Sequence, residues 1–149
     1  MNKPATNLES IATMCIAGRL RLLNRVITKL YDDALRPLGV KLSQGNILAV
    51  TAKLGVARPT EVCDILELDA STLSRTVERM VANGWLEILP GEDGRHHPFR
   101  LTQEGTQLME KAIPAWEKAQ TEATKLIGDD GLTLLNSAIK RVKSSSMER

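Results

Sequence analysis

Apolar side chains recur with a helical period along most of the chain. Residues 8–36 are predicted to form one long helix, because apolar residues return every three or four positions; these are Ile16, Leu20, Leu23, Ile27, Leu30 and Ala34. Pro37 ends this stretch. Residues 42–54 predict a second helix, with Ser43 as its N-cap and Gly55 at its end. A stripe as long as the first one indicates that another helix packs on it.

Two short helices joined by a tight turn are predicted next. Pro59 suits the first position of a helix, where its missing N–H costs nothing. Asp69 is a good N-cap for the following helix, and Gly84 ends that helix. Its buried face is predicted from helical spacing to consist of Leu73, Val77, Met80 and Val81. This arrangement is typical of a helix-turn-helix.

The opposite face of the second helix carries small hydroxyl side chains followed by arginines. Its residues are Ser71, Thr72, Ser74, Arg75, Thr76 and Arg79. Small side chains let a helix approach base edges, and arginine pairs bidentately with guanine O6 and N7. Taken alone, this helix could equally present an ordinary solvated face.

The residues after this helix favour the DNA-binding interpretation. Residues 86–88 and 99–101 alternate apolar and polar side chains, and Pro90-Gly91 opens a turn between them. A helix-turn-helix followed by a hairpin is a winged helix. Thr102 is then predicted to cap the next helix.

The polar tip of this hairpin is the second predicted DNA contact. Arg95 is expected to reach a flanking minor groove, where narrow A·T-rich tracts concentrate negative potential. Asp93 is placed to orient its guanidinium, with an unpaired, solvated acid as the alternative. His96 and His97 are most simply a polar hairpin tip, with phosphate contact as the second interpretation and metal binding as the third. If they contact phosphates, affinity should rise as pH falls through the ordinary histidine pKa of roughly 6.5.

The C-terminal part of the chain predicts further helices. An amphipathic pattern follows Gly105, with a kink expected at Pro114 and a break at residues 128–131. The last apolar stripe consists of Leu132, Leu135, Ala138, Ile139 and Val142. Terminal helices with unpaired apolar faces are what an intertwined dimer needs; the alternative is that they pack on each other within one monomer.

Composition narrows the class of protein. The chain has 149 residues, 42% of them hydrophobic and 26% charged, which predicts one globular domain over residues 1–149. It has no apolar run long enough for a bilayer and no apolar leader, so a cytoplasmic protein without membrane contact is expected. The cysteines and histidines suggest neither a metal site nor a nucleophile–base pair, so neither an enzyme nor a cofactor is expected.

Charge keeps a second class of function open. Residues 58–105 carry five basic and nine acidic side chains, a net charge of −4, within a chain whose net charge is +2. A winged helix used as a protein-interaction module is therefore the alternative to a DNA-binding regulator.

Three motifs in this region together point to a known family. Residues 69–80 are similar to its recognition helix, and Asn83-Gly84-Trp85-Leu86 matches its glycine turn into the wing. Asp93-x-Arg95, followed after five residues by Leu101-Thr102-x-x-Gly105, matches its wing signature. In these motifs, and in the order of the elements around them, the chain resembles the MarR (multiple antibiotic resistance regulator) family of bacterial transcription factors.

The resemblance implies a mainly α fold with a β-hairpin wing and a pseudopalindromic operator bound by a homodimer. Residues 8–36 and 106–149 would dimerise and residues 42–105 would bind DNA, with interface residues Ile16, Leu20, Leu23, Leu132, Leu135, Ile139 and Val142. It further implies a repressor released by a small-molecule effector or by oxidation.

Two cysteines bear on the redox alternative. Some relatives use a cysteine of the first helix as a peroxide sensor, and Cys15 lies in that helix. We nevertheless expect Cys15 to fill a buried, small apolar position, because the only tyrosine, Tyr31, lies far along the helix. Core packing is expected more strongly for Cys63.

Overall fold

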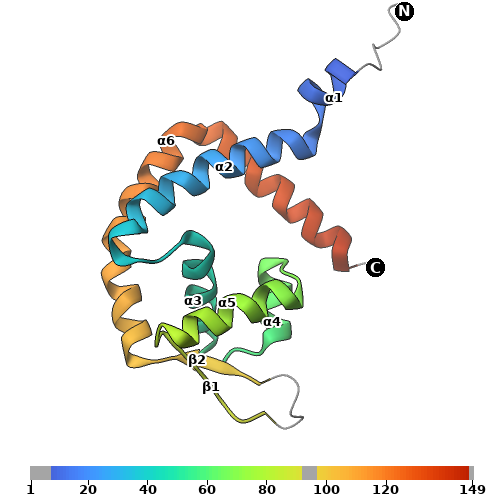
Figure 1. The fold of residues 1–149 in the computed structure, drawn as a ribbon. Helices are drawn as coiled ribbons and strands as arrows, with labels where there is room; N and C mark the ends of the chain where they lie inside the picture. Colours follow the sequence, from blue (N-terminus) through green and yellow to red (C-terminus); the bar gives the residue numbers. More distant parts are fainter. Residues whose placement is uncertain (1–7, 92–96, 148–149) are drawn as a thin grey trace, which may run out of the picture. The chain divides into compact units, whose positions relative to one another are not determined.

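The structure, a computed structural model, describes residues 8–91 and 97–147. It is mainly helical with a small antiparallel hairpin, as predicted (Figure 1). The elements in chain order are α1 (Leu8–Met14), α2 (Ile16–Leu35), the 3₁₀ turn η1 (Arg36–Leu38), α3 (Leu42–Leu54), α4 (Pro59–Leu66), α5 (Ala70–Ala82), β1 (Leu86–Ile88), β2 (Phe99–Leu101) and α6 (Gln103–Met147).

The chain divides into two compact units, which we describe separately. The winged unit comprises residues 34–118, and the terminal unit comprises residues 1–33 and 119–149. The prediction of one domain over residues 1–149 stays a prediction. None of the helices in the described ranges combines the length and the hydropathy needed to cross a membrane.

The winged unit is built around one apolar core. α4 packs against α3 and α5, and β1 and β2 close the unit against α5 and α3. The largest fully buried side chains include Phe99, Ile47, Leu48, Leu73, Met80, Leu86 and Val62. Thr51 is also buried, and its hydroxyl donates to the carbonyl of Ile47 at 2.7 Å, so burial leaves no unpaired polar atom there.

The helix-turn-helix forms where the sequence predicts it. α4 begins at Pro59, and Glu67 ends it in the left-handed conformation with φ of 52°. Asp69 caps α5, as expected. The N-cap of α3, however, is Lys41 and not Ser43: the Lys41 backbone is extended, and its N–H donates to the Gln44 side chain at 3.0 Å. Ser43 already lies in the first turn of the helix.

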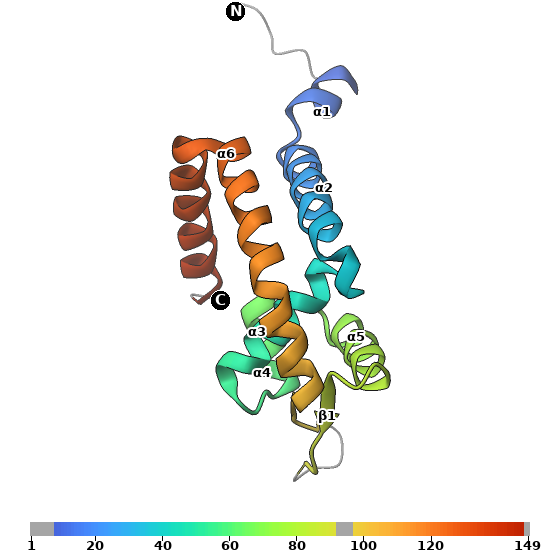
Figure 2. The same cartoon turned by 90° about the vertical axis from the view of Figure 1, so that its left-hand side faces the viewer.

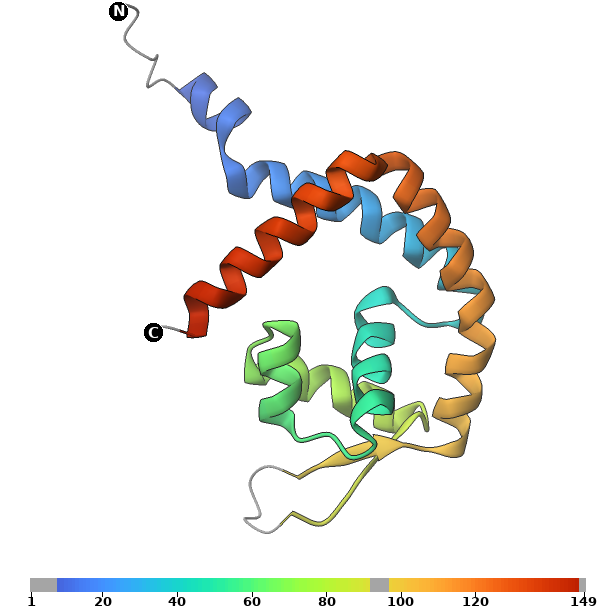
Figure 3. The same cartoon turned by 180° about the vertical axis from the view of Figure 1, so that it is seen from behind.

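The hairpin also pairs with a residue outside its two strands, Ala57. β1 and β2 pair with Leu86 opposite Leu101 and Ile88 opposite Phe99. The backbones of Ala57 and Phe99 exchange two hydrogen bonds of 2.9 and 3.0 Å, which ties the loop before α4 to β2. Figure 3 shows β2 running directly into α6. The buried Phe99 side chain therefore anchors the base of the wing.

In the terminal unit, the helix predicted over residues 8–36 is interrupted at Cys15, which separates α1 from α2 (Figure 2). The side chain of Arg19 donates to the carbonyl of Thr13 through two nitrogens at 3.2 and 3.1 Å, so it caps the end of α1. Every residue from Ile11 to Leu20 is exposed, so no packing keeps the helix continuous there. Further along α2, the Tyr31 hydroxyl donates to the Gln120 side chain of α6.

Within α6 the backbone leaves helical angles at Gly128, with φ of 75° and ψ of 163°. The break predicted at residues 128–131 is thus confirmed, and Figure 3 shows the last segment of the helix turning there. Pro114 keeps helical backbone angles, and the kink expected there stays a prediction. Ala112 and Ala115 on either side of it pack on the core of the winged unit, and this packing holds the helix in place despite the missing hydrogen bond.

Candidate nucleic-acid interface

Helix α5 presents a polar face opposite its buried one. Leu73, Val77 and Met80 are buried, as predicted. Among the predicted DNA contacts, the exposed ones are Ser71, Ser74, Arg75 and Arg79, while Thr72 and Thr76 are half-buried at the edge of the face. The structure thus gathers these six residues on one side of one helix.

Asp69 organises the first turn of this helix. Its carboxylate accepts from the Ser71 hydroxyl at 2.7 Å, the Thr72 hydroxyl at 2.6 Å and the Thr72 N–H at 2.8 Å. The hydrogen bond from the Thr72 hydroxyl, followed by that from Ser71, holds the pKa of Asp69 well below its usual range. Sequence reasoning identified Asp69 only as a cap; hydroxyls two and three residues further on were the available signal.

Two further hydrogen bonds set the side chains that follow. The Nε of Arg75 donates to the Ser71 carbonyl at 3.3 Å, which leaves the two terminal nitrogens of its guanidinium for a ligand. The Thr76 hydroxyl donates to the Thr72 carbonyl at 2.9 Å. Arg75 is therefore exposed and held to the preceding turn of α5 through its Nε.

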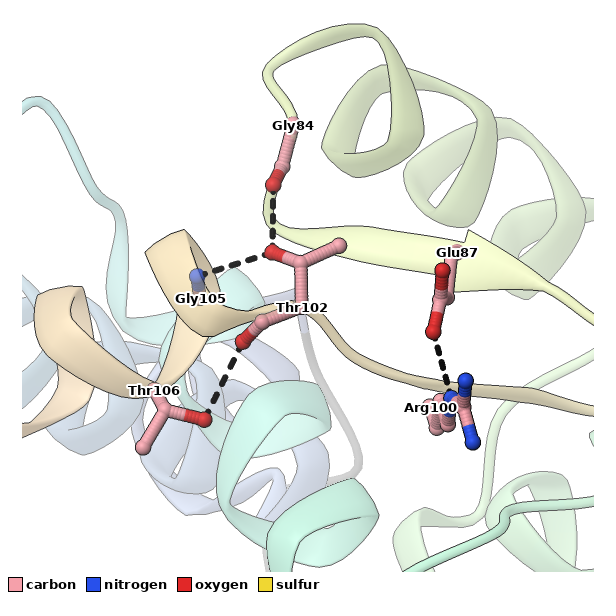
Figure 4. A network of polar contacts seen from close by, with 6 residues as sticks. All are labelled: Gly84, Glu87, Arg100, Thr102, Gly105 and Thr106. Carbon is pink, nitrogen blue, oxygen red and sulfur yellow. Dashed lines mark hydrogen bonds and ion pairs between the residues drawn. The ribbon is translucent and has the colours of Figure 1, made fainter.

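A polar network ties α5 to the wing and to α6 (Figure 4). The Thr102 hydroxyl donates to the Gly84 carbonyl at 2.5 Å and accepts the Gly105 N–H at 3.0 Å, so Thr102 caps α6 as predicted. Across the hairpin, Arg100 forms an ion pair with Glu87. These contacts fix the base of the wing beside the end of α5.

The predicted contacts at the wing tip are only partly described. Asp93, Arg95 and His96 lie outside the described residues. His97 is exposed, and its Nδ1 accepts the Gly91 N–H at 3.1 Å. Nδ1 of His97 therefore acts as a hydrogen-bond acceptor.

A groove of about 440 Å³ lies between α5 and the wing. Its lining includes Ser71 and Ser74 from α5, Ile88 from β1, and His97. Glu78 also lines it, and sequence reasoning did not include this acid in the face. Glu78 lies four residues after Ser74, which was the available signal.

A second hollow of about 160 Å³ lies within the winged unit, between α3 and α6. It is mostly apolar, with Leu42 and Ala49 from α3 and Met109 and Trp116 from α6 in its lining. Asn46 supplies an amide at its wall.

The two cysteines have different surroundings. Cys63 packs against the core, as expected, and burial, then the charges of Asp64 and Asp69, raise the pKa of its thiol. Cys15 is exposed, so the expected burial of this side chain is wrong. Cys15 lies at the break between α1 and α2, within a stretch of exposed residues.

The predicted dimer residues form apolar surfaces on the terminal unit. Ile16 and Val142 are 73% and 66% exposed, and Leu20, Leu23 and Ile139 are also exposed. Leu132 and Leu135 are half-buried. Within the residues that the structure describes, the first group therefore stays exposed to solvent.

Comparison with known proteins agrees with this geometry. Residues 38–96 match a family model described as MarR family. The chain is 29% identical to the multiple antibiotic resistance protein MarR of Salmonella typhimurium over 129 residues, 84% of this chain and 89% of that protein. An uncharacterised HTH-type transcriptional regulator, YwoH of Bacillus subtilis, is 32% identical over 87 residues, which span 58% of this chain and 64% of that relative.

Solved structures extend the similarity to nearly the whole chain. A mutant MarR from E. coli in complex with operator DNA has a TM-score of 0.79 and 26% identity, covering 92% of this chain and 99% of that one. The transcriptional regulator MOSR of M. tuberculosis in complex with DNA has a TM-score of 0.78 and 28% identity, covering 90% and 97%. In its three sequence motifs, its winged helix-turn-helix and these relatives, the chain is similar to members of the MarR family.

Proposed function

We propose that the protein is a sequence-specific transcriptional regulator that binds a pseudopalindromic operator as a homodimer. The observation that carries this proposal is the outer face of α5, where the exposed Arg75, whose Nε donates to the Ser71 carbonyl, lies beside small hydroxyl side chains. Such a face fits the major groove, and bidentate arginine reads guanine. DNA complexes of MarR and MOSR, which have the same fold, support this assignment.

Each part of the winged unit has a role in this proposal. α5 enters the major groove, with Arg75 on a base edge and Arg79 one turn further along. Arg95 at the wing tip enters the flanking minor groove, and His96 and His97 lie beside the phosphates. These roles assign no chemical reaction to the chain, and the protein would act in the cytoplasm, where the chromosome lies.

The terminal unit supplies the dimer. The exposed apolar side chains of α2 and of the last part of α6 would pack against the same surfaces of a second chain. A two-fold symmetric dimer presents two copies of α5, which matches an operator with two half-sites.

Repression relieved by a small effector completes the proposal. The hollow between α3 and α6 is apolar with a single amide at its wall, and this lining suits a small, mostly apolar molecule. Its occupant would have to favour one arrangement of the dimer over another to change operator affinity.

Selection of binding sites from random duplexes, followed by titration against salt, tests the proposal. We expect a palindromic consensus and a steep loss of affinity with added salt, because bound phosphates release counterions. No enriched sequence, together with salt-independent behaviour, would instead favour the protein-interaction module suggested by the net charge of −4 in residues 58–105.

Redox regulation through Cys15 is a second candidate, because this thiol is exposed. Treatment with peroxide should then lower operator affinity in the wild type and leave a Cys15→Ser variant unchanged. Equal responses of the two proteins would remove this candidate.

A further inference from the structure

The hydroxyl groups on α5 can read bases in two opposite ways, and this inference rests on the proposed function. A hydroxyl has one proton to donate and lone pairs that accept. In the major groove, the amino groups of adenine N6 and cytosine N4 donate, whereas guanine O6 and thymine O4 accept. The base that a serine or threonine selects therefore depends on whether its hydroxyl proton is already donated to another group of the protein.

The carboxylate of Asp69 accepts hydrogen bonds from both hydroxyls in the first turn of α5. The Ser71 hydroxyl lies 2.7 Å from Oδ1, and the Thr72 hydroxyl lies 2.6 Å from Oδ2. An ionised carboxylate only accepts hydrogen bonds, so both hydroxyls must be the donors. The lowered pKa of Asp69 keeps this carboxylate ionised at neutral pH.

We propose that Asp69 is a specificity-determining residue, which makes Ser71 and Thr72 acceptors and thereby selects adenine or cytosine at the base positions that they face. Both residues lie in the first turn of α5, the part of a recognition helix that contacts base edges. Arg75 is bonded through Nε to the Ser71 carbonyl and adds the complementary donors. The face thus combines acceptors for amino groups with donors for guanine.

The identity of residue 69 supports this role. Asparagine and serine cap a helix about as well as aspartate and carry no negative charge toward the phosphates of DNA. Only a carboxylate offers an acceptor oxygen to each of the two hydroxyls at once. The hydrogen bonds that the carboxylate accepts from the two hydroxyls therefore explain why an anionic side chain, Asp69, lies exposed before α5.

Asp69→Asn separates this role from capping. Oδ1 accepts from Ser71 and from the Thr72 N–H, whereas Oδ2 accepts only from the Thr72 hydroxyl. Asparagine keeps one oxygen for the cap and replaces the other with an amide that donates, which releases the Thr72 proton toward the groove. In selection from random duplexes, one position of each half-site should shift from adenine or cytosine to guanine or thymine. One hydrogen bond predicts a roughly twofold to tenfold change in preference.

Two further variants make the result specific. Asp64→Asn removes the same charge from an exposed residue of α4 and should raise affinity for all duplexes without changing base preference. Thr72→Val keeps Asp69 and should lose the preference for adenine or cytosine at the affected position. Asp69→Asn added to Thr72→Val should cause no further change there.

The outcomes distinguish this inference from the proposed function. If wild type and Asp69→Asn enrich the same bases at every position, the inference is wrong and the DNA-binding function stands. If the wild type enriches no sequence, the proposed function itself fails. Should Asp69→Asn unfold by circular dichroism, Thr72→Val decides alone, and an unchanged preference in that variant overturns the inference.

Discussion

Thr102 donates its hydroxyl proton to the carbonyl oxygen of Gly84 at 2.5 Å and so joins the start of α6 to the turn that ends α5. Its backbone N–H donates to the carbonyl of Trp85 at 3.1 Å, and its hydroxyl oxygen accepts the N–H of Gly105 (Figure 4). One side chain thus satisfies polar groups from two elements. The position of the wing beside α5 depends on this residue.

Replacing Thr102 by valine should destabilise the protein by about 1–3 kcal/mol, because the half-buried Gly84 carbonyl loses its donor and α6 loses its cap. Thr106→Val is the control, since the hydroxyl of that exposed residue donates to the backbone carbonyl of Thr102, which the Thr102→Val variant keeps. Urea unfolding followed by circular dichroism measures both variants. Equal stabilities would show that the Thr102 hydroxyl is dispensable.

A methyl group at Gly105 should be poorly tolerated. A Cβ there would lie 2.1 Å from the carbonyl oxygen of Trp85, so the helix and the turn must move apart. We expect Gly105→Ala to cost about 1–3 kcal/mol or more. Gly45→Ala in α3 has no atom within 4 Å of the new Cβ and should be neutral or stabilising, because alanine favours helix. Thermal unfolding of the pair checks this, and a more stable Gly105→Ala would contradict the packing.

Arg75→Ala should weaken binding to the selected operator by about 1–3 kcal/mol and relax base preference at one position of each half-site. Lys53→Ala, an exposed cation of α3 outside the polar face, is the control for loss of charge. Fluorescence anisotropy with operator and random duplexes separates the two effects. Equal losses on both duplexes would make Arg75 a phosphate contact.

A charge on the apolar face of the last helical segment should prevent dimerisation. Ile139→Asp places a carboxylate on the predicted interface, whereas Ser137→Asp adds the same charge on the opposite side of the helix. Sedimentation equilibrium should show a dimer for the wild type and Ser137→Asp, and monomer or aggregate for Ile139→Asp. A normal dimer of Ile139→Asp would place the interface elsewhere.

The two thiols should react at different rates with iodoacetamide. Cys15 is exposed, while burial raises the pKa of Cys63, so Cys63 holds less thiolate at neutral pH. A Cys15→Ser variant should therefore lose the fast phase of labelling, and a Cys63→Ser variant should keep it.

The raised pKa of Cys63 also predicts how stability depends on pH. Above the pKa of the unfolded thiol, the unfolded chain loses this proton before the folded one, so stability falls as pH rises through the folded value. Urea unfolding between pH 8 and pH 10, roughly around the ordinary cysteine pKa, should show a smaller decline for Cys63→Ser than for the wild type.

Local sequence signals were sufficient to predict most helices and strands of the winged unit. The cap at Asp69, the proline at the start of α4 and the alternation in the strands each act within a few residues, and tertiary packing agrees with them. The N-cap of α3 is Lys41 and not Ser43, because the Gln44 side chain reaches back to the Lys41 backbone N–H; composition does not decide between positions two residues apart.

In α1, α2 and α6, helix continuity depended on the packing around the helix, which the sequence does not give directly. The interruption at Cys15 occurs where every residue from Ile11 to Leu20 is exposed, and Pro114 stays helical where its neighbours pack on the core. Four of the six residues predicted for the outward face of α5 are exposed. The direction in which its hydroxyls donate was not predicted, because a hydroxyl can be a donor or an acceptor and the sequence does not tell which. The base contacts of this face stay predictions.

Gly128 has a consequence for the mutational tolerance of the terminal unit. With φ of 75° and ψ of 163°, it occupies a backbone region that is essentially restricted to glycine. Every single-nucleotide change that replaces glycine introduces a Cβ, so no one-step missense mutation preserves this geometry without strain. The direction of the helical segment after Gly128 therefore depends on this single residue. A substitution there would alter the apolar surface of the last helical segment and leave the DNA-facing residues of α5 unchanged.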